Sequence, residues 1–244
     1  MKQLLSTAAC FAICGLACAG ETSRSFLRDL SNMPMSERQA AAERYLADHP
    51  VNPIPLTPEG RVLFAYAGPG RDLRLVGDFT DWQPRISMTH VPGTNVWYHE
   101  IEFSPDARLD YKFMRDDTWL VDPRNPFTCM SGFGPNSEFR GETYRPPPFM
   151  QGNRMRPAQC SFDTLDVETP QLGGSRKVVV MTPPNIDGPH RRYLLVHDGL
   201  EYLSLANLDR AMAWAARTIK PAELPICVCV PPGRRTEEYA TTLQ

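Results

Sequence analysis

The sequence has no excess of positive charge, no long apolar run and no paired set of metal-binding cysteines. Its 26 Lys and Arg residues are balanced by 28 Asp and Glu residues, which gives a formal net charge of -2. Without a basic surface, nucleic acid is not an expected partner. The apolar run near the amino terminus is too short to span a bilayer, so no stable membrane span is predicted. With 42% apolar residues, the 244-residue chain can still bury one large core or two modest ones.

The first nineteen residues are typical of a secretory signal peptide. A lysine precedes an apolar run from Leu4 to Leu16, and Ala17-Cys18-Ala19 then has the small-x-small form of a signal peptidase site. We therefore expect residues 1–19 to be removed and the protein to be periplasmic or secreted. Lipidation of Cys18 is an alternative, although the place three residues before it holds Gly15 rather than the leucine typical of lipoproteins.

Three of the seven cysteines fall in this leader, and Cys129, Cys160, Cys227 and Cys229 remain. In an oxidising compartment Cys129 and Cys160, both in loop-like sequence, can form a disulfide. Cys227 and Cys229 alternate with valines on a predicted strand, so both thiols should face one way and act as small hydrophobes. No second pair at metal spacing accompanies them, and neither a metal site nor a cofactor is predicted.

Four regions follow the leader. Residues 20–58 hold a helix that begins near Ser36 and a Pro-rich connector. Residues 59–140 contain short strands between Gly, Pro and Asp turns, which is typical of an all-β sandwich; the strands are expected at 62–66, 73–76, 96–101 and 109–113. Residues 141–159 are rich in Pro, Gly, Arg and Asn and are typical of a linker. Residues 160–244 form the last region.

The last region alternates strands with a helix. Residues 161–168 and 176–181 fit an antiparallel hairpin that turns at Gly173-Gly174. The runs 176–181 and 193–196, rich in β-branched residues and closed by Pro or Gly, are also predicted to be buried parallel strands. A helix over 205–219 and a buried strand over 224–230 complete a crossover that implies a parallel sheet. His197-Asp198-Gly199 lies at the sheet edge where open α/β folds bind ligands.

The β-rich region resembles immunoglobulin-like early-set domains, which precede glycan-processing enzymes or act as glycogen-binding modules. The likeness rests on Val76 to Trp82, Met88, Val96-Trp97, Asp110 to Phe113, Asp117-x-Trp119 and Asp122 to Pro126. In the binding members two Trp residues stack on sugar rings while a Lys and an Asn bond to hydroxyls; the matching residues are Trp82, Trp119, Lys112 and Asn136. The resemblance implies an α-glucan as one candidate partner. The alternative is that Trp82 and Trp97 are ordinary core residues of the sandwich and that the domain packs on a catalytic domain.

A second likeness rests on Val96-Trp97, Asp122 to Pro126, Ser137-Glu138-Phe139 and Pro146-Pro147-Pro148. Through these residues the region resembles the amino-terminal domain of enterobactin esterases, which join an early-set domain to an α/β-hydrolase. In the last region, three motifs resemble the esterase branch of the α/β-hydrolases: Thr182-Pro183-Pro184, His197-Asp198-Gly199 and Arg235-x-x-Glu238-Tyr239. The fold implied is an all-β immunoglobulin-like sandwich followed by the amino-terminal part of a three-layer α/β/α hydrolase domain.

The resemblance also implies site residues. In the family, the loop after the His-Asp-Gly strand supplies one N–H group of the oxyanion hole, so Gly199 and Leu200 are the candidate positions. The residues expected to border the site are Asp198, Arg235, Glu238 and Tyr239. Arg235 would meet a substrate carboxylate or phenolate and Glu238 would orient it; an ordinary loop ion pair is the alternative. His197 is expected to be a packing or turn residue.

No Gly-x-Ser-x-Gly occurs in the sequence, and Ser161, Ser175 and Ser204 lack the strand–turn–helix setting of a nucleophile. The expectation is therefore a serine carboxylic-ester hydrolase for small-molecule or carbohydrate esters, cut off before its nucleophile and inactive as written. The alternative is a non-catalytic exported protein that binds glycans through the early-set domain.

Overall fold

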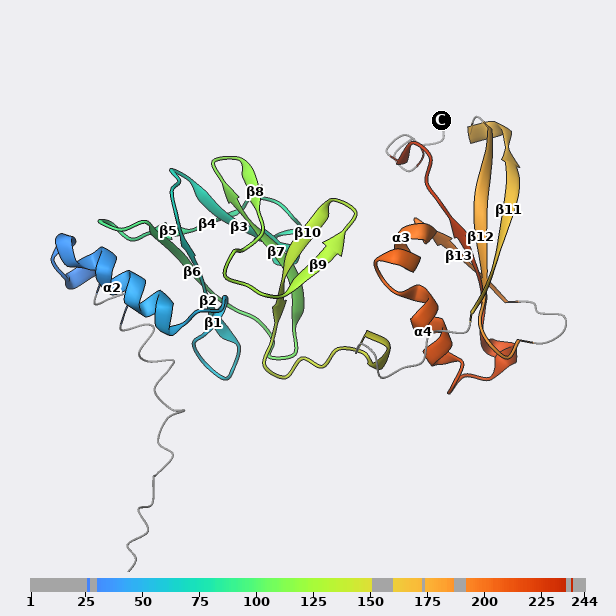
Figure 1. The fold of residues 1–244 in the computed structure, drawn as a ribbon, viewed down its shortest axis with the longest axis horizontal. Helices are drawn as coiled ribbons and strands as arrows, with labels where there is room; N and C mark the ends of the chain where they lie inside the picture. Colours follow the sequence, from blue (N-terminus) through green and yellow to red (C-terminus); the bar gives the residue numbers. More distant parts are fainter. Residues whose placement is uncertain are drawn as a thin grey trace, which may run out of the picture. The chain divides into compact units, whose positions relative to one another are not determined.

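The computed structural model describes residues 26, 30–150, 160–172, 174–186, 192–235 and 238. Contacts divide the chain into two compact units, the first ending at Tyr144 and the second beginning at Arg145 (Figure 1). The expected leader 1–19, residues 151–159 of the expected linker and Tyr239 lie outside the described residues. None of the helices within the described ranges is long and apolar enough to cross a membrane.

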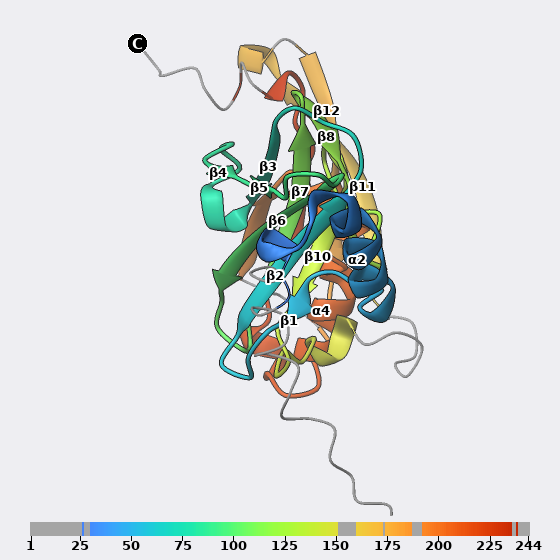
Figure 2. The same ribbon diagram turned by 90° about the vertical axis from the view of Figure 1, so that its left-hand side faces the viewer.

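The first unit opens with helix α2 (Met35–Asp48), which was predicted and ends as expected before Pro50. Its buried face packs on strands of the first sheet through Ala42, Tyr45 and Leu46, which share a core with Leu63 and Val96. Both views place α2, in blue, alongside the sheet that holds β2 and β6 (Figures 1 and 2). The helix therefore belongs to the β-rich unit.

Two antiparallel sheets make up the rest of the first unit. One has the order β1-β2-β6-β5, with strands Ile54–Pro55, Arg61–Ala67, Val96–Glu102 and Thr89–His90. The other has the order β4-β3-β7-β10-β9, with strands Ile86–Ser87, Leu73–Gly77, Arg108–Arg115, Gly134–Arg140 and Thr128–Ser131, and β8 (Thr118–Leu120) also pairs with β7. Side chains from both sheets, including Phe64, Leu75, Trp97 and Tyr111, form one core. All four strands predicted in this region are confirmed.

The Asp122-to-Pro126 segment is held by a buried polar network. The Asp122 carboxylate is 1% exposed and accepts hydrogen bonds from the Tyr111 hydroxyl at 2.6 Å and the Asn52 amide at 2.8 Å. Its other oxygen accepts the Arg124 N–H at 2.8 Å. Burial raises the pKa of Asp122 although these bonds oppose the shift. The Asp122-to-Pro126 segment therefore has a structural role in the first unit, where buried hydrogen bonds hold it in place.

The second unit contains a four-stranded mixed sheet of order β11-β12-β14-β13. Strands β11 (Ser161–Thr169) and β12 (Gly174–Thr182) form the predicted antiparallel hairpin. Strand β13 (Tyr193–His197) runs parallel to β14 (Ile226–Val230), and helices α3 (Gly199–Ser204) and α4 (Leu208–Ala215) lie between them in the chain. The predicted parallel pair with a helical connection is confirmed.

Three details of the second unit differ from the sequence prediction. Strand β12 is antiparallel to both of its neighbours, so the expectation that 176–181 is a parallel strand was wrong. Strand β13 is an edge strand with most of its side chains exposed, so the expectation that it is buried was wrong as well. The helix expected over 205–219 is shorter, since α4 begins only at Leu208, after Asn207 in a left-handed conformation with φ 52°, and ends at Ala215; α3, at Gly199–Ser204, was not predicted.

The cysteines settle two further expectations. Cys227 and Cys229 are both fully buried in one core with Met181 and Met212, as predicted for a Cys-x-Cys strand. Cys129 and Cys160, which the sequence allowed to pair, both carry free thiols and belong to different units.

Candidate functional sites

The first candidate site lies at the end of β13, in the second unit. Asp198 follows the strand in a left-handed conformation with φ 55°, and α3 begins at the next residue. Gly199 is buried directly against β14: a Cβ atom added to it would lie 2.4 Å from the Cα atom of Cys229. Only a residue without a side chain allows this approach. The first amides of a helix have no acceptor within the helix, so the tight turn brings Gly199 and Leu200 to the carboxyl end of β13 with donors to offer.

Arg235 reaches this turn from the segment after β14. Its Nη2 atom lies 3.2 Å from Asp198 Oδ1 and also contacts Glu201 Oε1 in the first turn of α3. The predicted neighbourhood of Asp198 and Arg235 is therefore present in the structure. Glu201 was missed by the sequence analysis. In the sequence, Glu201 is only an acidic residue near the start of a helix. This position does not indicate that it pairs with an arginine 34 residues away.

Glu238 does not orient Arg235 as expected but pairs with Arg176 on β12. Arg176 Nη1 donates to Glu238 Oε2 at 2.8 Å, and Nη2 donates to Oε1. The same carboxylate accepts the N–H groups of Gly233 and Arg234, each at 3.1 Å. The Arg176 hydrogen bond is the main cause that lowers the pKa of Glu238 to about 2. Arg176 was not singled out from the sequence, where it is one charge at the start of an apolar strand.

The three serines considered as nucleophiles lie within strands or within a helix. Ser161 lies on β11 and Ser175 on β12, and the Ser204 hydroxyl donates to the Leu200 carbonyl at 2.8 Å within α3. His197 is the last residue of β13. None of these described serines occupies a turn between a strand and a helix, in agreement with the sequence analysis.

The second candidate site is the outer face of the six-stranded sheet in the first unit. The Trp82 and Trp119 rings lie with centroids 6.4 Å apart and planes tilted by 47°. Trp119 pairs with Met114 across β7 and β8, and Lys112 lies two residues from Met114 on the same face. Trp119 is 47% exposed, so it is not a core residue. The structure thus brings Trp82, Trp119 and Lys112 to one face.

Asn136, the fourth residue of the expected sugar site, is buried and already engaged. Only 4% of its surface is exposed, and its amide donates to Asp110 Oδ2 at 3.1 Å. Its role in the structure is to hold Asp110 on the neighbouring strand. The expectation that Asn136 offers a free amide to a sugar hydroxyl was therefore wrong.

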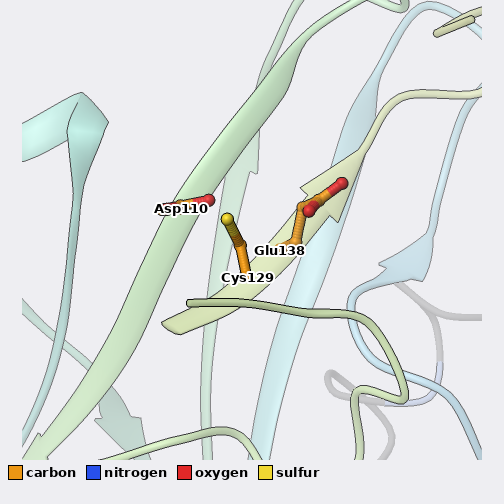
Figure 3. Close-up of side chains that lie close together, drawn as sticks. All are labelled: Asp110, Cys129 and Glu138. Atoms are coloured by element: carbon orange, nitrogen blue, oxygen red, sulfur yellow. The ribbon is translucent and has the colours of Figure 1, made fainter. Parts of the chain in front are cut away.

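Asp110 also belongs to a cluster with Cys129 and Glu138 that resembles a set of metal ligands. Their ligand atoms all lie within 4.8 Å of one another, and Figure 3 shows the Cys129 thiol between the two carboxylates. Arg108 Nη2, however, lies 2.8 Å from Asp110 Oδ1 and 3.0 Å from Glu138 Oε2. Burial raises the pKa of Asp110, and the charge of Arg108 opposes that shift. The guanidinium already supplies the positive charge that a metal ion would bring.

The described residues as a whole are mostly β-sheet with few helices, and the fold is that of the enterobactin esterases. The chain is similar to the enterobactin esterase from Shigella flexneri solved in the presence of enterobactin, with a TM-score of 0.51 and 16% identity. That match covers 70% of this chain and 52% of the esterase. The ferric enterobactin esterase from Salmonella typhimurium gives a TM-score of 0.55 at 15% identity and covers 73% and 55% of the two chains.

The chain spans about half the length of the solved structures it matches. No protein-family model matches the chain. No curated protein sequence matches it either. The likeness is therefore one of fold.

Proposed function

We propose that the chain is part of an exported carboxylic-ester hydrolase of the enterobactin-esterase type. In this proposal the first unit is an immunoglobulin-like early-set domain, and the second unit is the amino-terminal part of an α/β-hydrolase domain. The fold likeness and the order of the two units support it. The intact protein would cleave a small-molecule or carbohydrate ester, with enterobactin as the named ligand of one similar structure.

The observation that carries the proposal is the turn after β13. It stands at the carboxyl end of one strand of a parallel pair, where α/β folds place their ligand sites. Its left-handed Asp198 and its tightly packed Gly199 fix the first amides of α3 at that edge. Backbone amides held in this way can stabilise the negative charge of a tetrahedral intermediate. Removing one such donor from an enzyme costs roughly 100-fold to 1,000-fold in kcat.

The 244 residues contain no Gly-x-Ser-x-Gly, so we expect them to hydrolyse no ester by themselves. The test is the rate of p-nitrophenyl acetate hydrolysis, compared with variants in which Ser161, Ser175 or Ser204 is replaced by Ala. The four rates should equal one another and the background. Activity that disappears in one variant would identify a nucleophile and contradict this part of the proposal.

Export is proposed from the leader alone. Cleavage after Ala19 would leave Gly20 as the first residue of the mature protein. Intact-mass measurement of the protein recovered from the periplasm or medium should give the mass of the chain from Gly20. Protein found only in the cytoplasm, with residues 1–19 retained, would oppose export.

A second candidate function is glycan binding by the outer face of the first unit. The adjacent Trp82 and Trp119 rings, with Lys112 on the same face, favour it, because flat aromatic faces suit the apolar faces of sugar rings. Titration with maltoheptaose should then change Trp fluorescence in the unmodified chain, and Trp119→Ala should abolish the change. No change at millimolar sugar would exclude this function.

A further inference from the structure

The Arg235-x-x-Glu238 motif connects strand β12 to the turn after β13 in the second unit. Glu238 pairs with a residue of the strand, and Arg235 pairs with residues of the turn. Glu238 is tied to Arg176 on β12, and both side chains are largely buried, at 13% and 14% exposure. Arg235 is tied to Asp198 and Glu201 at the start of α3, and these side chains are 29% to 40% exposed. One end of the motif is therefore fixed in the sheet, while the other end holds the turn after β13.

Glu238 also shapes the segment that carries Arg235. Its carboxylate accepts the N–H groups of Gly233 and Arg234, and its own N–H donates to the Arg234 carbonyl at 3.0 Å. The carboxylate that binds Arg176 therefore also satisfies two backbone donors of the segment that carries Arg235. The position of the Arg235 guanidinium then follows from the position of β12.

The far end of this connection contacts a turn that contains a left-handed residue. Asp198 is a non-glycine residue in the left-handed region, a conformation that persists where surrounding contacts impose it. Gly199 is held on its inner side by β14. Arg235 supplies a contact from the other direction and neutralises two carboxylates placed next to the first amides of α3.

We propose that Arg235-x-x-Glu238 is a positioning clamp that fixes the Asp198-Gly199 turn relative to β12, and that Arg235 acts through Asp198 and Glu201 rather than by binding a substrate anion. The inference rests on the proposed function, because the turn matters as the candidate oxyanion site. It replaces the expected substrate-binding role of Arg235, since the guanidinium is already engaged by two carboxylates.

Hydrogen exchange of the full chain, read by mass spectrometry of its peptides, tests the clamp. Arg235→Gln should speed exchange in the peptide that contains residues 196–204 by about fivefold or more, as loss of a partly exposed ion-pair network allows local opening. Peptides of the β11–β12 hairpin should not change. Glu238→Gln should speed exchange at both 196–204 and 231–235. Arg217→Gln, which removes one exposed arginine from the same unit, is the matched control and should change neither.

A charge exchange separates a specific contact from general loss of structure. Arg235→Glu and Glu201→Arg should each speed exchange at 196–204, and the double variant should restore most of the protection because the pair is reversed. Unchanged exchange in Arg235→Gln, or failure of the double variant to recover any protection, would overturn the clamp. These outcomes do not depend on ester hydrolysis, so the clamp and the proposed function can fail separately.

Discussion

Replacement of Gly199 by Ala tests the geometry of the candidate oxyanion turn. The added methyl group would lie 2.4 Å from the Cα and Cβ atoms of Cys229 and 2.7 Å from its carbonyl carbon. Carbon atoms pack at about 3.5 to 4.0 Å, so α3 would have to move away from β14 by roughly 1 Å. Overpacking of this kind costs about 1 to 3 kcal/mol. In a solvent-exposed helix, Gly→Ala would instead raise the free energy of unfolding by up to about 1 kcal/mol. The sign of the measured change therefore shows whether Gly199 is packed against β14.

Urea unfolding of the second unit provides the assay. The buried thiols of Cys227 and Cys229 become accessible only when their core opens, so pulse labelling with a maleimide at each urea concentration reports the transition. Gly199→Ala should lower the free energy of unfolding by about 1 to 3 kcal/mol. Leu200→Ala is the neighbouring control; its side chain is 44% exposed, and the expected change is below about 1 kcal/mol. An unchanged or higher midpoint for Gly199→Ala would refute the close approach of α3 to β14.

Three further predictions concern charge and burial. The pKa of Glu238 is lowered to about 2, so its pairing with Arg176 stabilises the fold above the ordinary pKa of about 4.5. This stabilisation is lost as the pH falls toward 2. Glu238→Gln should therefore remove this part of the dependence of the free energy of unfolding on acid pH. Burial raises the pKa of Cys227 to about 11, so at pH 8 in native buffer Ellman's reagent should react with the partly exposed Cys129 well before Cys227. Asp122→Ala leaves the buried Asn52 and Tyr111 donors without their acceptor, and should lower the free energy of unfolding of the first unit by about 2 to 4 kcal/mol. A decrease below about 1 kcal/mol in thermal or urea unfolding would contradict the structural role of Asp122.

The strands of the first unit were predictable because they are short apolar runs between Gly, Pro and Asp turns. On β2, Val62 to Tyr66 are all buried, with Phe64 in the core between the two sheets and Leu63 in the core shared with α2. The buried pair Cys227 and Cys229 was predictable because residues two apart on a strand share a face. The order of apolar and turn residues along the chain was therefore enough to predict these strands.

Direction and edge position were not predictable from the same patterns. A run of β-branched residues such as Val178 to Val180 fits a parallel or an antiparallel strand equally well, and the hairpin with β11 decides in favour of the second. The apolar β13 was expected to be buried, but its place at the sheet edge leaves Tyr193 and Leu195 exposed. The start of α4 at Leu208, later than predicted, depends on the single left-handed residue Asn207 before it.

The site was predicted in part. Asp198 and Arg235 do lie together, as the resemblance implied, and Trp82 lies beside Trp119. The partners that explain the arrangement, Glu201 and Arg176, could not be chosen from the sequence because ion pairs between distant residues depend on how the strands are ordered. Spacing alone suggested that Glu238 serves Arg235, whereas in the structure the two side chains point to different anchors.

The reading frame that contains the codon of Gln244 tests the central claim most directly. If the second unit is the amino-terminal part of an esterase domain, the frame should continue and encode Gly-x-Ser-x-Gly, and the full product should hydrolyse a small ester in a manner lost when that serine becomes alanine. A stop codon directly after Gln244, or a full product whose ester hydrolysis survives that substitution, would contradict the account.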